Sequence, residues 1–172
     1  MADHPKPGTG QFPGQDISYV LNVLRRYKRV AMVGLSPNPN RPSYFAATYL
    51  IDHGYEVIPV NPVAQGKDIL CQPVYPSLAD LPEVPEVVNI FRKPEDVPPL
   101  VDEAIRLGAK AIWMQLGVIH MEARQKALDA GLEVVMDRCM KIEHARFYGG
   151  LNTAGIRTGL ISSRKPRQII RI

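Results

Sequence analysis

The sequence predicts an α/β fold in which a parallel sheet of about five strands lies between layers of helices. Short apolar runs alternate along the chain with segments of helical periodicity, and the runs are apolar over nearly their whole length. Strands of that kind are typical of parallel sheets, because helices cover both faces of such sheets. The expected architecture is therefore a Rossmann-like three-layer fold. With 172 residues, one such domain can bury about 70% of the surface that its unfolded chain exposes.

Five apolar runs are the expected strands. The first reads RVAMVG and ends in glycine, and the second reads EVIPV and is followed by Asn61 and Pro62. Each run is short and is bounded by turn-forming residues or by a segment of helical spacing, as buried strands are. The strands are expected over residues 29–34, 56–60, 84–91, 110–115 and 132–136.

Four segments between these runs have the spacing of helices. In the first of them Ile17, Val20, Leu21 and Leu24 share one helical face. A glycine follows each of the other three, at the position where glycine commonly ends a helix. The helices are expected over residues 16–26, 43–53, 94–107 and 121–130.

Two stretches show no clear period. Residues 63–81 are expected to form a loop punctuated by prolines, and the segment from residue 137 is expected to be irregular, with one short helix near 142–147. The chain is thus divided into three parts. They are an N-terminal extension (1–14), a ligand-binding domain (15–148) and a basic irregular C-terminal tail (149–172).

Composition excludes several classes of function. The net charge of +4 is concentrated near the C-terminus, but no aromatic residues interleave with those cations, so a solvated tail is favoured over a nucleic-acid site. Cys71 and Cys139 lie far apart and form no CxxC pair, and the four histidines are scattered, so no metal site is expected. No apolar run is long enough to span a membrane, and Met1–Gly14 lacks the apolar stretch of a signal peptide, which favours the cytoplasm.

The loop after the first expected strand is the main candidate for a ligand site. Open α/β sheets bind ligands outside the carboxyl ends of their strands, where the strand order reverses. Gly34 permits a tight turn, Ser36 and Ser43 offer hydroxyls, and Arg41 offers a charged fork suited to phosphate. The helix that follows points its first amides at the loop, which makes an anion site. The alternative is a plain turn in which Ser43 only caps the helix.

The same region argues against NAD. The loop has one glycine of the GxGxxG pattern, Gly34, and no Gly-Lys-Ser/Thr follows it. A dinucleotide site usually places Asp or Glu after the second strand to hold the ribose, whereas Asn61 and Pro62 stand here. The missing carboxylate suits a nucleotide with a phosphate near its ribose, and Lys67 is a candidate partner for that phosphate. The alternative for Lys67 is a solvated loop lysine.

Three further loops are expected to reach the same edge. Arg92 and Lys93 follow the third strand beside a helix start, and they either meet an anionic ligand or belong to an ordinary surface loop. After the fourth strand, Gln115 can hydrogen-bond an amide and Gly117 allows close approach of the backbone. Cys139 follows the fifth strand, where it either contacts the ligand or is a buried packing residue.

Seven short motifs, in this order, give the chain a resemblance to stand-alone CoA-binding domain proteins, which are similar to the CoA-binding domain of the succinyl-CoA synthetase alpha subunit. The resemblance covers roughly residues 19–148. The motifs are V-G-L-S-P (33–37), N-R-P-S (40–43), V-N-P (60–62), P-V-Y-P-S-L-A-D-L-P (73–82), F-R-K-P (91–94), W-M-Q-L-G (113–117) and V-M-D-R-C-M-K-I-E-H (135–144).

The resemblance implies a coenzyme A site across the carboxyl edge of the sheet. Phosphates are expected at the first loop, the adenosine end near Asn61 and Lys67, and the pantetheine arm between Phe91 and Gln115. The thiol end then approaches Cys139, with which it can form a mixed disulfide under oxidation. The implied binding residues are Gly34, Leu35, Ser36, Arg41, Ser43, Asn61, Pro62, Lys67, Phe91, Arg92, Lys93, Gln115, Gly117 and Cys139.

The expected function is the binding of coenzyme A or an acyl-CoA by a carrier, sensor or regulator, with no catalytic residue. The chain lacks the second domain and phosphorylated histidine of the synthetase alpha subunit, and no triad of nucleophile, base and orienting residue is visible. Two alternatives stay open: a subunit of an acyl-CoA ligase that needs a partner chain, and an NAD(P)-dependent oxidoreductase. A homodimer contact through the segment after residue 137 is also open.

Overall fold

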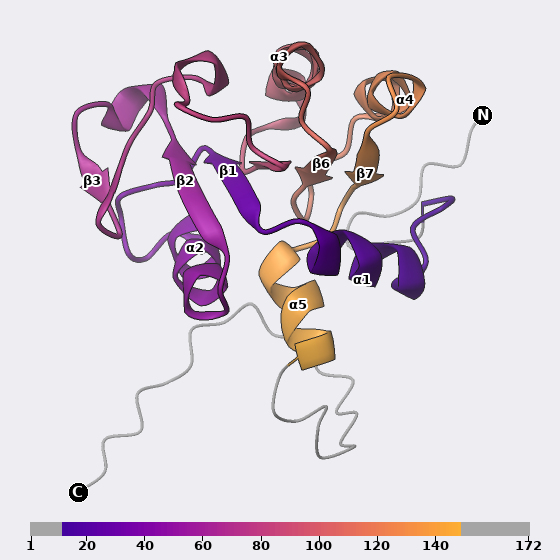
Figure 1. Ribbon diagram of the computed structural model, residues 1–172, viewed down its shortest axis with the longest axis horizontal. Coiled ribbons are helices and arrows are strands. Elements are labelled where there is room, and N and C mark those ends of the chain that lie inside the picture. Colours follow the sequence, from indigo (N-terminus) through magenta and orange to yellow (C-terminus); the bar gives the residue numbers. More distant parts are fainter. Residues whose placement is uncertain (1–11, 149–172) are drawn as a thin grey trace, which may run out of the picture.

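The computed structural model describes residues 12–148, and its centre is a five-stranded parallel sheet. Its strand order is β2-β1-β5-β6-β7, and Figure 1 shows the sheet between two layers of helices. The predicted fold class is confirmed. The strands are β1 (Arg29–Val33), β2 (Glu56–Val60), β5 (Val87–Ile90), β6 (Ala111–Met114) and β7 (Glu133–Val135).

The five helices divide between the two faces of the sheet (Figure 1). One face carries α1 (Ile17–Arg26), α2 (Pro42–Asp52) and α5 (Met140–Tyr148), and the other carries α3 (Val97–Leu107) and α4 (Met121–Asp129). Three short 3₁₀ helices lie in the connections, over Pro62–Ala64, Leu78–Asp80 and Pro94–Asp96.

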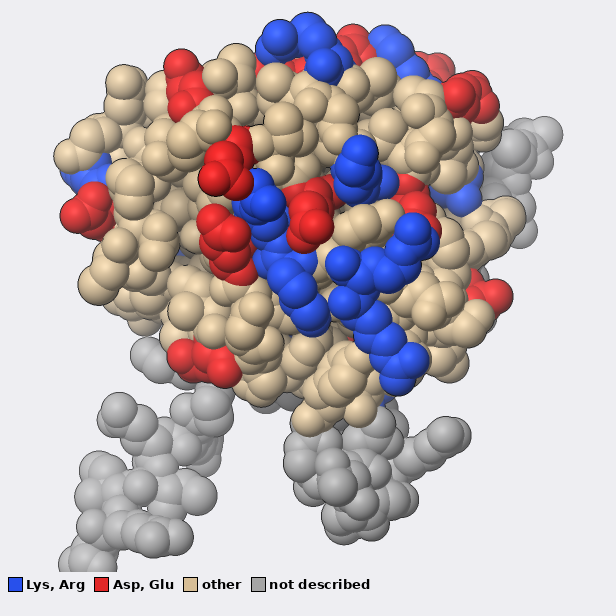
Figure 2. Space-filling view, viewed as in Figure 1, with Lys and Arg blue, Asp and Glu red and all other residues tan. Residues whose placement is uncertain are grey.

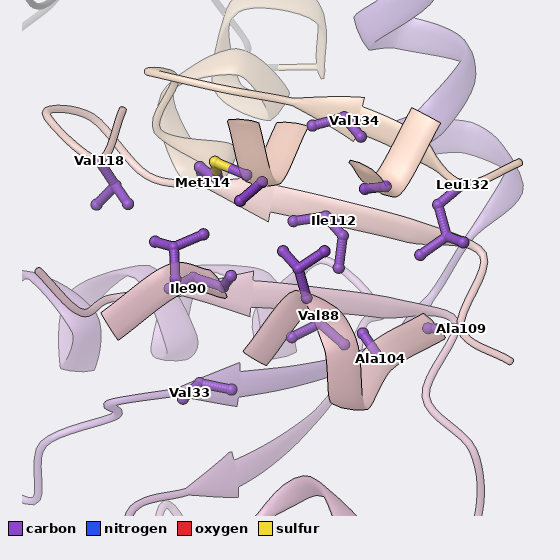
Figure 3. Packing of buried hydrophobic residues seen from close by; sticks show 14 of the residues in the cluster. Val33, Val88, Ile90, Ala104, Ala109, Ile112, Met114, Val118, Leu132 and Val134 are labelled. Carbon is purple, nitrogen blue, oxygen red and sulfur yellow. The ribbon is translucent and has the colours of Figure 1, made fainter. Parts of the chain in front are cut away.

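Alternation along the strands fills a separate core on each face. In β5 the side chains of Val88 and Ile90 point toward α3 and α4, and Val87 points toward the opposite layer. Figure 3 shows the first of these cores, to which β6 adds Ile112 and Met114. Because both faces are covered, every residue of β5 and β6 is buried, which explains why all of them except Asn89 are apolar.

Several element boundaries differ from the expectation. The third strand begins at Val87 and not at residue 84, because the Glu86 carboxylate accepts the backbone N–H groups of Lys28 and Arg29 and thereby ties the residues before the strand to β1. The loop at 63–81 contains a small hairpin, β3 (Asp68–Ile69) with β4 (Gln72–Pro73). The short helix expected at 142–147 is longer in the structure, since α5 covers Met140–Tyr148. The predicted tail from residue 149 lies outside the described residues.

The strand order creates a switch point between β1 and β5. From β1 the chain moves to β2 on one side, and it then crosses to β5 on the other side of β1. The loops that leave β1 and β5 therefore diverge toward opposite faces of the sheet. Between such diverging loops, outside the carboxyl ends of the strands, α/β sheets bind their ligands.

The surface of this domain has mixed charge. Figure 2 shows basic and acidic side chains interspersed over the face that is viewed. Ion pairs such as Arg26–Glu133 and Arg29–Glu56 account for part of this mixture. Among the described residues, no helix combines the length and apolar character that a membrane crossing requires, and no group of three metal-ligating side chains comes together.

Candidate ligand-binding site at the carboxyl edge of the sheet

Gly34 brings the loops after β1 and β5 into direct contact. Its φ of +86° lies in the left-handed region, and a Cβ at this position would overlap the carbonyl oxygen of Phe91. The Gly34 N–H donates to the carbonyl of Val60 at 2.8 Å, so the end of β2 is held there as well. We call this contact between Gly34 and the Phe91 backbone the Gly34 ridge, because it lies at the switch point between loops that lead to opposite faces of the sheet.

Side-chain hydrogen bonds fix the shape of the β1–α2 loop. The Ser43 hydroxyl accepts the backbone N–H of Ser36 at 3.1 Å, and the Ser36 hydroxyl accepts that of Asn38 at 3.2 Å. The Asn38 side chain in turn accepts the N–H of Asn40 at 2.9 Å. These polar groups therefore build the loop itself, and they hold Arg41 in place at the first turn of α2.

Arg41 differs from the other predicted cations of this edge. Arg92 pairs with Asp96 at 3.1 Å, and Lys93 lies 3.9 Å from Glu95, so acidic neighbours offset both charges. Arg41 is exposed at the N-cap of α2 and has no acidic partner among the residues that the structure describes. An anion at this edge would find its strongest attraction at Arg41 and the first turn of α2.

Asn61 joins the first two loops. Its side-chain N–H donates to the carbonyl of the fully buried Leu35 at 2.9 Å, and its side-chain oxygen accepts the N–H of Val63 at 3.1 Å. Pro62, which follows, begins a 3₁₀ helix. Lys67 lies exposed just before β3, away from the hollows described next.

A hollow of about 360 Å³ lies where α2 and α5 begin, on the face of the sheet that these helices share. We call it the apolar hollow, because most of its walls are aromatic or aliphatic. The two helices pack against each other (Figure 1). The lining residues are Pro42, Phe45, Ala46, Phe91, Gln115, Leu116, Val118, Cys139, Lys141 and Ile142.

A buried chain of polar groups holds Gln115 in the wall of the apolar hollow. The side chain is 4% exposed, and its N–H donates to the carboxamide oxygen of Asn89 at 2.9 Å. Asn89 in turn donates to the sulfur of Met140 at 3.6 Å, which connects β6, β5 and the first residue of α5. This chain orients the Gln115 carboxamide before any ligand arrives.

Cys139 lies directly before α5 in the wall of the apolar hollow. Burial raises the pKa of its thiol above the usual value, although the backbone N–H groups of Lys141 and Ile142 partly counteract this effect. The thiol is therefore protonated near neutral pH, and its nucleophilicity is low. Its two predicted roles, as a packing residue and as a ligand neighbour, are compatible at this position.

A second hollow of about 250 Å³ lies beyond the Gly34 ridge, on the side of α3. We call it the charged hollow, because it contains three carboxylates and a guanidinium. Asp96 pairs with Arg92, and Glu103 accepts the N–H of Ala79 at 3.1 Å. The lining residues are Val33, Gly34, Val60, Pro62, Pro76, Ser77, Leu78, Arg92, Glu95, Asp96, Pro99, Leu100 and Glu103.

The turn after β6 is tied to the end of β7. The Gly117 N–H donates to the Asp137 carboxylate at 2.7 Å, and Asp137 is buried with a φ of +56°. A Cβ on Gly117 would meet no atom within 4 Å, so its glycine serves the turn and not a close contact within the protein. This bond places Leu116, the preceding residue, at the rim of the apolar hollow.

The structure distributes the predicted binding residues over two hollows, the hydrogen-bonded loops and the exposed surface. Phe91, Gln115 and Cys139 line the apolar hollow, whereas Gly34, Pro62 and Arg92 line the charged hollow. The hydrogen bonds of the loops employ Leu35, Ser36, Ser43, Asn61 and Gly117. Arg41, Lys93 and Lys67 are exposed and line neither hollow.

Sequence reasoning missed seven residues of the apolar hollow. They come from the first turns of α2 and α5 and from the turn after β6. A search of the helix starts that follow the predicted loops would have found most of them. They are Pro42, Phe45, Ala46, Leu116, Val118, Lys141 and Ile142.

The fold and these hollows define an α/β domain of the doubly wound class with a candidate site at its switch point. A family model described as a CoA binding domain matches residues 28–145, more than half of the chain. The chain therefore belongs to the CoA-binding domain family, and the resemblance drawn from the motifs is confirmed.

Three known proteins place the chain further. The uncharacterized protein YneT of Bacillus subtilis (strain 168) is 36% identical over 126 residues, which cover 73% of this chain and 92% of YneT. A hypothetical protein from Pyrococcus horikoshii OT3 superimposes with a TM-score of 0.76 at 39% identity, covering 86% of this chain and 99% of its own. The apo acetyl-coenzyme A synthetase 1 of Ca. Korarchaeum cryptofilum has a TM-score of 0.54 at 21% identity, covering 62% of this chain and 25% of the synthetase. This last likeness shows the fold alone.

Proposed function

We propose that this domain binds coenzyme A or an acyl-CoA as a carrier, sensor or regulator and catalyses no reaction of its own. Membership of the CoA-binding domain family supports the ligand. The observation that carries the proposal is the position of Arg41, an exposed cation without an acidic partner in the described chain, on the helix whose first turn lines the apolar hollow. Such a site suits a ligand in which a phosphate group is followed by a neutral, largely aliphatic arm.

The phosphates fit the β1–α2 loop best. The positive end of the α2 dipole lies at this loop, and the Arg41 guanidinium can make two parallel hydrogen bonds to phosphate oxygens. At the end of β2, Asn61 stands where a carboxylate would repel a phosphate on the ribose. This combination favours coenzyme A over NAD.

The adenosine end fits the neighbourhood of Pro62 and the charged hollow. An adenine ring is neutral and carries an amino group that donates hydrogen bonds, so carboxylates such as Glu95 and Asp96 would accept them. A phosphate would be repelled from the same carboxylates. The ligand would therefore cross the Gly34 ridge, with its phosphates at the crossing.

The pantetheine arm fits the apolar hollow. The arm alternates aliphatic groups with two amides, and the hollow pairs aliphatic and aromatic walls with the fixed carboxamide of Gln115. Its volume of about 360 Å³ is near the lower end of the range for small-molecule pockets, roughly 300–1,000 Å³. It therefore suits one arm of the ligand, and a whole nucleotide would exceed it.

The lining of the apolar hollow supports binding without catalysis. Among the described residues that line it, none is Asp, Glu or His, the side chains that most often serve as the general base in hydrolysis or acyl transfer. The raised pKa of the Cys139 thiol keeps it protonated and slow as a nucleophile.

Calorimetric titration of the purified chain with coenzyme A, NAD and NADP tests the proposal. We expect coenzyme A to bind tightly and the nicotinamide dinucleotides to bind weakly. Arg41→Ala should weaken coenzyme A binding about 10- to 100-fold, the loss of a charge-assisted hydrogen bond. Arg26→Ala is the matched control, since Arg26 pairs with Glu133 far from this edge. Equal affinity for all three cofactors, or none for coenzyme A, would overturn the proposal.

A further inference from the structure

The walls of the apolar hollow come from three separate parts of the fold. Phe45 and Ala46 lie on α2, Leu116 and Val118 lie in the connection from β6 to α4, and Ile142 lies on α5. Ala46 and Val118 are buried, so they form the inner wall. Three elements thus converge on one apolar space beside the Gln115 carboxamide and the Cys139 thiol.

Leu116 shows that this apolar surface continues to the rim. Its side chain is 51% exposed, although the residues on both sides of it are held by hydrogen bonds of the turn. Leu116 thus adds to the aliphatic and aromatic lining that Phe45 and Ile142 supply. A bare thiol would leave the exposed surface of Leu116 and the half-buried side chain of Ile142 without a ligand contact.

We propose that the apolar hollow accepts the short aliphatic acyl chain of an acyl-CoA, so that the physiological ligand is a thioester and not free coenzyme A. This inference rests on the proposed function. The end of the pantetheine arm would enter beside Gln115 and Cys139, and the acyl group would extend it along Phe45, Ile142 and Leu116. The carboxamide of Gln115 and the thiol of Cys139 face the thioester end of the ligand.

The chemistry of the wall is compatible with an intact thioester. A thiolate at Cys139 would attack the thioester carbon and release coenzyme A, whereas a protonated thiol does so slowly. Burial of Cys139 in this wall raises its pKa and so favours the protonated form. A hollow that stores or senses an acyl group needs this low reactivity.

The competing ligand is an acyl group with a negative charge, and Lys141 is the lining residue that would favour it. Among the described residues that line the hollow, it alone carries a permanent charge, and it is half-buried in the first turn of α5. Its aliphatic stem can extend the apolar wall while the ammonium group reaches solvent. If the ammonium group instead pointed at the ligand, a dicarboxylic acyl group would bind better than an aliphatic one.

Titration with coenzyme A and with acetyl-, propionyl-, butyryl- and succinyl-CoA tests the inference. We expect affinity to rise about fourfold with each added methylene up to butyryl, the gain expected when a methylene leaves water for an apolar wall. Equal affinity for coenzyme A and butyryl-CoA would overturn the acyl inference and leave the proposed function intact. Tighter binding of succinyl-CoA than of butyryl-CoA would also overturn the aliphatic assignment. Failure of every CoA compound to bind would overturn the proposed function itself.

A pair of exposed variants separates the acyl contact from general effects on stability. Leu116→Ser should reduce the preference for butyryl-CoA over coenzyme A at least threefold, because it removes the apolar rim. Met121→Ser is the matched control, since Met121 is also exposed but begins α4 outside the hollow. An unchanged preference in Leu116→Ser, or the same loss in both variants, would contradict the inference.

Discussion

The apolar hollow and the charged hollow lie at the same edge of one sheet, yet they present opposite surfaces. The first is bounded by the beginnings of α2 and α5 and contains no carboxylate among its described lining residues, whereas the second contains Glu95, Asp96 and Glu103. The difference has a local cause. Glu95 and Asp96 lie in the 3₁₀ turn directly before α3, where they suit the helix dipole and offset Arg92 and Lys93. In the first turn of α2, by contrast, no acidic residue offsets the positive end of the helix dipole.

This contrast teaches that a cation after a strand is not by itself a phosphate site. Arg41 and Arg92 follow adjacent strands of the sheet and lie near the same ridge. Only the neighbours of each guanidinium decide whether its charge is available. The predictions below test this contrast, beginning with the ridge that separates the two hollows.

Gly34→Ala should have the largest effect, because it removes the ridge geometry. The added Cβ would overlap the backbone carbonyl of Phe91, and alanine is strained at a φ of +86°. We expect the free energy of unfolding to fall by about 3 kcal/mol or more, the sum of backbone strain and overpacking. Urea unfolding of the wild type and the variant measures this loss.

Gly131→Ala is the control for the ridge. Its φ of +83° is similar, but a Cβ there would meet no atom within 4 Å. We expect a loss of about 1 kcal/mol from backbone strain alone. Similar losses in the two variants would show that the Gly34 contact with the β5 loop does not matter for stability.

The two arginines should differ in their effect on coenzyme A binding. Arg41→Ala removes a cation that has no acidic partner within residues 12–148, and it should cost about 1.5–3 kcal/mol of binding free energy. Arg92→Ala removes a charge that Asp96 already offsets and should cost less than about 1 kcal/mol. Titration at low and high salt adds a check, since the affinity of the Arg41 variant should depend less on salt. A larger loss in the Arg92 variant would reverse the assignment of the phosphate site.

The fold was predictable because the evidence for it is local. Continuous apolar strands, and glycines such as Gly108, with its left-handed φ of +83° at the end of α3, identify a parallel doubly wound sheet without tertiary information. The tight turn at Gly34 was predictable for the same reason, whereas the part of Gly34 and Arg41 in ligand binding stays a prediction. The effects of prolines, and of hydrogen bonds from side chains to distant strands, are harder to predict from a sequence. For this reason the start of β5 was placed three residues early.

The walls of the apolar hollow were not predictable in the same way. Phe45 and Ile142 are far apart in the chain, and they meet only because α2 and α5 pack side by side on one face. The segment that forms α5 has weak amphipathic periodicity, because it buries polar residues such as Glu143 and His144. Glu143 is held there by Arg138 at 3.3 Å and Arg146 at 3.4 Å, which no local pattern reveals.

A buried histidine makes the anchoring of α5, one wall of the apolar hollow, dependent on pH. His144 on α5 lies between the rings of Tyr49, His53, Tyr55 and Tyr148, and its Nδ1 is 3.1 Å from the Tyr49 hydroxyl. Burial, with a smaller contribution from the positive charges of His53 and Lys28, lowers its pKa from 6.5 to about 4. The folded protein therefore keeps this histidine neutral, while the unfolded chain takes up a proton near pH 6.5.

The neutral His144 contributes fully to the free energy of unfolding above pH 6.5, and this contribution is lost as the pH falls toward 4. Between pH 7.5 and 5 we expect the wild type to lose about 1 kcal/mol more than His144→Gln does, after allowance for solvent screening. Urea unfolding at both pH values measures the difference. His120→Asn is the control, because Asn can replace the cap that His120 gives to Ala123 at 3.1 Å. Equal acid sensitivity in the wild type and His144→Gln would show that α5 is not anchored by a neutral histidine.

The smallest expected effect is the reactivity of Cys139 toward coenzyme A disulfide. The Cys139 thiolate would attack one sulfur of that disulfide, form a mixed disulfide with one CoA and release the other as a thiolate, which then takes up a proton. Because burial raises the pKa of Cys139, the reaction should be slow at pH 7 and faster as the pH rises above 9.

Intact-mass spectrometry of Cys71→Ser, which removes the exposed second thiol, should show one CoA adduct. Cys71→Ser combined with Cys139→Ser should show none. An adduct that forms equally fast at every pH, or no adduct even at high pH, would place the thiol end of the ligand outside the apolar hollow.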